Sequence, residues 1–71
     1  MENTIDSRLI DLLSILDARA TINIYTDEDT RMFSGEVYKF LANDKLMHKY
    51  KNYEITAISF GLVDNILITE K

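Results

Sequence analysis

A leucine-rich stripe near the start of the chain is the clearest pattern in the sequence. Its members are Ile5, Leu9, Leu12, Leu13 and Leu16. The steps of three and four residues between them match one face of an α-helix. The spacing therefore predicts a helix over residues 4–18, with Asn3 or Thr4 as its N-cap. Ile10 and Ile15 lie beside the stripe, and we expect them to widen the buried face.

An alternating, β-branched segment at residues 21–26 predicts a strand. We expect Ile22 and Ile24 to point inward from it. Residues 27–30 are polar and predict a turn. Residues 31–41 then predict a second strand that pairs back on the first.

Gly35 lies inside this second predicted strand, on the same face as Phe33 and Val37. Glycine weakens the interior of a strand and commonly marks a bulge or a sharp bend. We therefore expect the second strand to be irregular at Gly35, as a small, strongly curved sheet requires.

The alternation breaks between residues 42 and 52. Asn43 or Asp44 is a suitable cap for one or two helical turns in this segment. The apolar side chains of those turns are Leu46, Met47 and Tyr50. The segment is therefore predicted to be a short helix or a loop.

Two further strands are predicted near the end of the chain, at residues 53–60 and 66–69. Residues 61–65 form the turn between them. Asp64 and Asn65 are expected to make its tight pair, because both residue types tolerate left-handed conformations.

Together these elements predict a single α+β domain that spans all 71 residues. Their order is helix, strand, strand, short helix or loop, strand, strand. Because the connections are short, we expect an antiparallel sheet with the N-terminal amphipathic helix packed on one face. The sheet is expected either to be small and strongly bent or to form a partly open barrel of the SH3 or Sm type.

The composition limits the cellular compartments and the kinds of partner that we expect for this chain. The chain has no cysteine, which excludes disulfides and thiolate metal sites. Its net charge of −4 opposes a general affinity for nucleic acid or anionic lipid. Residues 1–4 are polar and acidic, unlike a signal peptide or a membrane span. We expect a cytoplasmic protein that does not contact a membrane.

Small size favours self-association. A domain of this length buries only about 60% of the surface that it exposes when unfolded, and it usually needs further stabilisation. Without a disulfide, association through an apolar face or a sheet edge is the remaining route. We expect a homo-oligomer, with a dimer favoured, and a protein partner whose identity the sequence does not reveal.

Catalysis is not expected. His48 is the sole histidine and lies in a lysine-rich segment, which indicates a solvated residue rather than a general base. The consecutive acids at residues 27–29 would point in different directions, unlike the ligands of a calcium loop. The chain is therefore predicted not to be an enzyme and to use no cofactor or metal.

Charges are segregated along the chain. A candidate acidic surface in the first half comprises Asp6, Asp11, Asp17, Asp27, Glu28 and Asp29. A candidate partner-binding surface in the middle comprises Tyr38, Lys39, Lys45, His48, Lys49, Tyr50, Lys51 and Tyr53. Lysine interleaved with tyrosine is typical of a single-stranded nucleic-acid platform, and equally of a protein contact or of a loop over the edge of a core.

About half of the chain resembles the Sm-like proteins. Leu9–Leu16, Ile22–Tyr25 and Gly35–Phe40 are similar to the N-terminal helix, first strand and glycine-bent second strand of that family. The resemblance implies a small barrel and a single-stranded RNA ligand. This chain has Leu41 where the family has an aspartate, and Asn52 in place of the histidine of a Tyr-Lys-His motif.

Nearly the whole chain is similar in outline to small prophage-type proteins of low-GC Gram-positive bacteria. The shared motifs, after a leucine-rich helix, are Ile22-x-Ile24-Tyr25, Phe33-x-Gly35-x-Val37-x-x-Phe40 and Tyr53-Glu54-Ile55-x-x-Ile58. This resemblance implies a phage accessory protein that acts by binding a host protein.

Three functions follow as hypotheses. The leading one is a non-catalytic protein-interaction module from a phage or prophage, such as an inhibitor of a host protein. The second is an Sm-like protein that binds single-stranded RNA through the lysine and tyrosine residues. The third is an acidic nucleic-acid mimic, which requires the candidate acidic residues to form one face.

Overall fold

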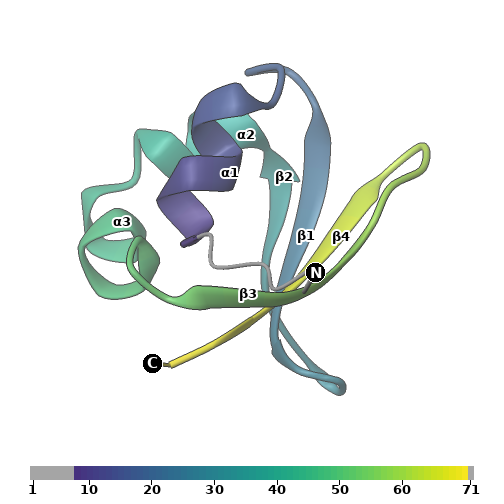
Figure 1. Cartoon of the computed structure of the whole chain (residues 1–71). Coiled ribbons are helices and arrows are strands. Elements are labelled where there is room, and N and C mark those ends of the chain that lie inside the picture. Colours follow the sequence, from purple (N-terminus) through teal and green to yellow (C-terminus); the bar gives the residue numbers. More distant parts are fainter. Residues whose placement is uncertain (1–7, 71) are drawn as a thin grey trace, which may run out of the picture.

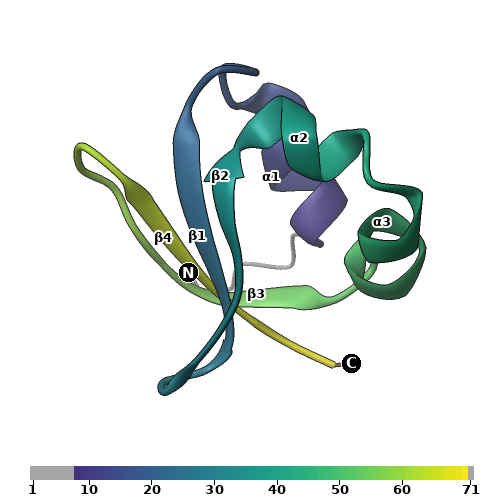
Figure 2. The same ribbon diagram turned by 180° about the vertical axis from the view of Figure 1, so that it is seen from behind.

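Three short helices lie on one side of a four-stranded sheet (Figure 1, Figure 2). The computed structural model describes residues 8–70, and its elements in chain order are α1 (Leu9–Ile15), β1 (Thr21–Asp27), β2 (Thr30–Glu36), α2 (Val37–Leu41), α3 (Asp44–Tyr50), β3 (Glu54–Ser59) and β4 (Asp64–Thr69). This arrangement confirms the predicted α+β class, with a helix packed on a small, bent sheet. No helix in this part of the chain is long and apolar enough to cross a membrane.

The sheet has the strand order β2-β1-β4-β3 and mixes both strand directions. β1 pairs antiparallel with β2, and β3 with β4. β1 and β4 pair in parallel at the centre, with Ile24 opposite Ile66, so the prediction of a wholly antiparallel sheet is wrong there. Residues 37–53, which contain α2 and α3, carry the chain from one edge of the sheet to the other. A connection of this length permits parallel pairing.

One apolar core joins the helices to the sheet. Its buried side chains are Leu9, Leu12, Leu13, Ile22, Ile24, Val37, Phe40, Ile55, Ile66 and Ile68. The predicted inward positions of Ile22 and Ile24 are confirmed, as is the leucine face of the first helix. Burying a side chain of this size contributes roughly 1.5–3 kcal/mol relative to leaving it in water, so this cluster is the main source of stability.

α1 begins later than the sequence predicts. Arg8 is extended and forms an antiparallel bridge with Glu54, so Leu9 is the first helical residue described. The Asp11 carboxylate accepts a hydrogen bond from the Arg8 N–H at 3.2 Å, which supports this start. The predicted caps, Asn3 and Thr4, lie outside the described residues. So does Ile5, the first residue of the stripe.

α1 also ends before the predicted last turn. Leu16 is extended, and the Asp17 side chain accepts a hydrogen bond from the Arg19 N–H at 2.8 Å. Such an aspartate turn competes with helix formation, which explains the early end. Ile10 is half-buried, but Ile15 is 80% exposed. The prediction that Ile15 widens the buried face is therefore wrong.

The predicted second strand is split into β2 and α2. Val37 and Phe40 are both fully buried. A separation of three residues puts these side chains on one face of a helix, whereas it would put them on opposite faces of a strand. The Val37 N–H also donates to the Ala20 carbonyl at 3.0 Å, which holds the start of α2 against the end of the α1–β1 connection. The strand prediction is therefore wrong for residues 37–41.

Gly35 has a special backbone conformation but forms no bulge. It pairs in register with Ile22, and its φ of +152° is one that side-chain-bearing residues rarely adopt. The irregularities of the β1–β2 pairing lie instead between Ile24 and Asp27. The structure thus places the bulges nearer the turn than the sequence suggested.

α3 confirms the short helix predicted within residues 42–52. Asn43 is its N-cap, and the Asn43 side chain accepts a hydrogen bond from the Leu46 N–H at 3.1 Å. Leu46, Met47 and Tyr50 pack against the core as predicted.

The turn of the last hairpin lies earlier than predicted. Asp64 and Asn65 are the first residues of β4, and the turn is formed by residues 60–63. The Asp64 carboxylate accepts a hydrogen bond from the Gly61 N–H at 3.2 Å. Asp64 therefore shapes the turn through its side chain, while its backbone belongs to the strand.

Candidate functional site

The turn between β3 and β4 exposes a cluster of apolar side chains. Residues 60–63 read Phe-Gly-Leu-Val. Phe60 is 65% exposed, Leu62 is fully exposed, and Val63 is also exposed. The turn of this hairpin stands away from the three helices (Figure 1), in agreement with the exposure of these side chains. We call Phe60, Leu62 and Val63 the apolar tip.

Polar contacts, rather than burial, hold this turn. The hydrogen bond from Gly61 to Asp64 closes it, and Asn65 Nδ2 donates to the Val63 carbonyl at 3.5 Å. Turns are normally built from glycine, proline, asparagine, aspartate and serine. The apolar side chains of Phe60 and Leu62 therefore serve no evident purpose in the turn itself.

The sheet face opposite the helices carries two rows of side chains in register. The first row comprises Ser34, Asn23, Asn65 and Ser59. The second row comprises Arg31, Tyr25, Leu67 and Ala57. Asn23 Nδ2 donates to Asn65 Oδ1 at 3.1 Å and so links the two central strands. Arg31 is the one charged member of the two rows, which makes this open face largely neutral.

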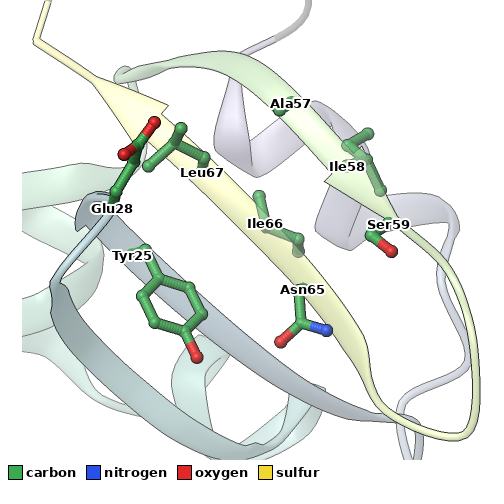
Figure 3. Close-up of a pocket in the computed structure, with 8 residues that line it drawn as sticks. All are labelled: Tyr25, Glu28, Ala57, Ile58, Ser59, Asn65, Ile66 and Leu67. Carbon is green, nitrogen blue, oxygen red and sulfur yellow. The ribbon is translucent and has the colours of Figure 1, made fainter.

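An open hollow of about 320 Å³ lies on this face (Figure 3). Its lining residues are Tyr25, Glu28, Ala57, Ile58, Ser59, Asn65, Ile66 and Leu67. Tyr25 and Leu67 lie on the adjacent strands β1 and β4, and Glu28 supplies the charge at one end (Figure 3). Ser59 lines the hollow and directly precedes Phe60, so the hollow adjoins the apolar tip along one hairpin.

The predicted partner-binding surface of lysines and tyrosines is divided between two elements. Tyr38 and Lys39 lie on α2. Lys39 Nζ is 3.5 Å from Glu36 Oε1, so a neighbouring acid offsets its charge. Tyr38 lines a hollow with Arg19, apart from the hollow along α3. These two residues therefore contribute to a different surface from the rest of the set.

The remaining members lie on α3 or just after it. Lys45, His48 and Lys51 line one hollow on the exposed side of this helix, and Asp44 lies at the same hollow, so its basic residues outnumber its one acid. The rings of Tyr50 and Tyr53 meet edge to face at 4.9 Å and pack against the core. Lys49 Nζ lies 5.3 Å from the Tyr50 ring centre, within cation–π range. This part of the predicted surface is therefore basic, with its aromatic rings already engaged by neighbours.

The candidate acidic residues do not form one face. Asp11 lies on α1 and Asp17 in the turn after it, whereas the acids at residues 27–29 surround the β1–β2 turn. β1 runs between the α1–β1 connection, which contains Asp17, and this turn, so the length of a whole strand separates them (Figure 1). Asp6 lies outside the described residues. Within residues 8–70, no cluster of three histidine, aspartate or glutamate side chains is arranged to hold a metal.

Comparison with known proteins gives no relative: no family model, no curated protein and no solved structure matches the chain. The Sm-like and prophage-type resemblances therefore stay predictions. Function must be inferred from the surface itself, because a fold alone does not specify one.

The apolar tip is the feature that the sequence reasoning missed. The sequence predicts a turn at residues 61–65, with Asp64 and Asn65 as its turn formers. The available signal was the composition of the turn, since Phe60, Leu62 and Val63 are not residues that turns require. An apolar turn in a small charged protein indicates a contact surface.

Proposed function

We propose that this chain is a small, non-catalytic protein-interaction module of the phage accessory type, which inserts its apolar tip into a groove on a partner protein. The observation that carries the proposal is the exposure of Phe60, Leu62 and Val63 at the end of a projecting hairpin. Contiguous exposed apolar side chains mark interaction sites, and aromatic residues among them are frequent energetic anchors. The assignment to phage proteins rests on the outline of the sequence.

The charges around the tip specify the chemistry of the partner. Between Asn52 and Glu70 the chain contains no lysine or arginine, and the charged residues are Glu54, Asp64 and Glu70. An anionic membrane or a nucleic acid would be repelled by such a hairpin. A protein groove with an apolar floor and a neutral or basic rim complements it.

The two other hypotheses have less support. Stacking of RNA bases needs free aromatic faces, and Tyr50 is half-buried between Tyr53 and Lys49. A nucleic-acid mimic needs one continuous acidic face, and Asp17 is separated from the β1–β2 turn by a whole strand. The apolar tip needs no rearrangement to bind a protein.

The test uses the double variant Leu62→Ser/Val63→Ser as bait in a pull-down from an extract of low-GC Gram-positive cells. Both side chains are exposed, so we expect the free energy of unfolding to change by less than about 0.5 kcal/mol. We expect the wild-type chain to retain a specific protein partner, and the variant to retain roughly tenfold less. Loss of about 1.4 kcal/mol of tip contacts corresponds to that factor.

Ile15→Ser is the matched control for this experiment. Ile15 is likewise an exposed apolar residue, but it lies at the end of α1 and outside the tip. We expect this variant to retain the partner as well as the wild-type chain does. Equal recovery by the tip variant, or recovery of no specific partner by any bait, would contradict the proposal.

A further inference from the structure

The two edges of the sheet differ in their protection. β2 carries Arg31 and Glu36 and follows the acidic β1–β2 turn. β3 is the other edge, and from Ile55 to Val63 the chain contains no charged residue and no proline. Edge strands expose N–H and C=O groups that pair readily with another chain, and proteins normally block them with charges, proline, bulges or covering segments.

Only the start of β3 is covered in residues 8–70. Arg8 bridges to Glu54, and the Leu9 N–H donates to the Tyr53 carbonyl at 2.8 Å. The register with β4 shifts between Ile55 and Ala57. From Ala57 onward, the described residues show β3 paired with β4 on one side. The outer side of Ala57, Ile58 and Ser59 is therefore a short, neutral edge with small or apolar side chains.

We propose that β3 pairs antiparallel with β3 of a second copy of this chain, about a two-fold axis at Ile58. Ile58 would face its own counterpart, and Ala57 would face Ser59. The Arg8 bridge at Glu54 and the register shift before Ala57 limit the pairing to residues 57–59. The product is a continuous eight-stranded sheet that carries both sets of helices on one side.

A second copy fits this edge better than a charged partner does. A two-fold axis repeats the same residues on both sides of an interface, so an edge that carried one sign of charge would repel itself. Residues 56–60 carry no charge, although the chain as a whole has a net charge of −4. A 71-residue domain without disulfides also gains needed stability when the outer side of β3, which has no described pairing after Glu54 in residues 8–70, is closed.

The pairing is independent of the docking role of the tip, although the two are compatible. Antiparallel pairing directs the two β3–β4 hairpins to opposite ends of the joined sheet. Leu62 and Val63 lie beyond the paired residues and remain exposed in the dimer. Separate substitutions therefore test the two proposals.

The experiment is sedimentation velocity on the full chain from micromolar to sub-millimolar concentration. The edge variant is Ala57→Lys/Ser59→Lys, which places lysines opposite each other across the two-fold axis. Both native side chains are exposed and point away from the core. We expect the wild-type chain to sediment as two chains, and the edge variant as one. Two facing like-charge pairs raise the dissociation constant by about tenfold or more.

Two further samples keep the result interpretable. Thr30→Lys/Ser34→Lys adds the same charge to exposed positions of the opposite edge, β2, and should leave the dimer intact. A mixture of the edge variant with Ala57→Glu/Ser59→Glu should restore a species of two chains, because the facing charges are then opposite. This rescue cannot arise from unfolding. A monomeric wild-type chain, a dimer that survives in the edge variant, or a mixture that does not associate would each overturn the proposal.

Discussion

Gly35 holds a backbone conformation that any side chain would strain. Its φ is +152°, and a Cβ atom at this position would lie 3.3 Å from Cζ of Phe33. Phe33 in turn packs edge to face on Phe40, with ring centres 5.2 Å apart. The Phe33 ring therefore cannot retreat without disturbing a fully buried side chain.

We predict that Gly35→Ala lowers the free energy of unfolding by about 1–3 kcal/mol, through backbone strain and displacement of Phe33. Chemical denaturation followed by circular dichroism measures this change. Gly61→Ala is the matched control, because its Cβ would meet only the Val63 carbonyl, at 3.8 Å. We expect that variant to stay within about 0.5 kcal/mol of the wild-type chain. Equal effects of the two substitutions would contradict the special role of Gly35.

At the scale of elements, α3 depends on its cap because it is only seven residues long. Helices this short are not stable by propensity alone. We predict that Asn43→Ala, which removes the acceptor for the Leu46 N–H, lowers the free energy of unfolding by about 0.5–2 kcal/mol. Asn52→Ala, beyond the other end of α3, should have a smaller effect, since Asn52 makes only an exposed 3.4 Å hydrogen bond with Arg8. Thermal and denaturant unfolding of both variants would show whether the cap matters.

Elements whose pattern is decided locally could be predicted from the sequence. The alternation around Ile22 and Ile24 specifies β1, and the leucine spacing specifies α1. Residues 37–41 were predicted to be a strand because β-branched and aromatic residues favour strands. They form the helix α2 instead, because a helix buries Val37 and Phe40 on the same face. That second signal was present in the sequence as their separation of three residues.

Relations between distant segments could not be predicted. The parallel pairing of β1 with β4 depends on how α2 and α3 carry the chain across the sheet, and no local pattern encodes that path. The functional surface posed the same difficulty. Lys39 and Lys45 lie only six residues apart in the sequence. Glu36 nevertheless offsets the charge of Lys39, whereas Lys45 lines the hollow along α3. The composition of the β3–β4 turn signals an apolar segment, but the exposure of Phe60 and Leu62 depends on how this hairpin lies relative to the helices.

At the scale of the whole molecule, opposite charges lie on separate parts of a chain with a net charge of −4. The lysines of α3 form the basic side, and the acids of residues 27–29 lie at the far turn of the β1–β2 hairpin. A single-stranded RNA that follows the α3 lysines would be attracted over one helix and repelled by the remainder of the molecule. The two lysines of α3 and Lys51 just after it, without a free stacking surface, are a weak site for such a ligand.

We therefore predict that fluorescence anisotropy of a labelled single-stranded RNA stays flat when this chain is added at low salt. Binding through phosphates is strongest at low salt, so this condition gives RNA its best opportunity. A saturable rise that falls steeply with added salt, and that disappears in Lys45→Gln/Lys49→Gln, would favour RNA binding over protein docking. Leu62→Ser/Val63→Ser separates the two functions, because it leaves the lysines of α3 in place and removes the apolar tip. If the chain loses its protein partner without the tip and does not bind RNA, then it recognises its target through apolar contact rather than through charge.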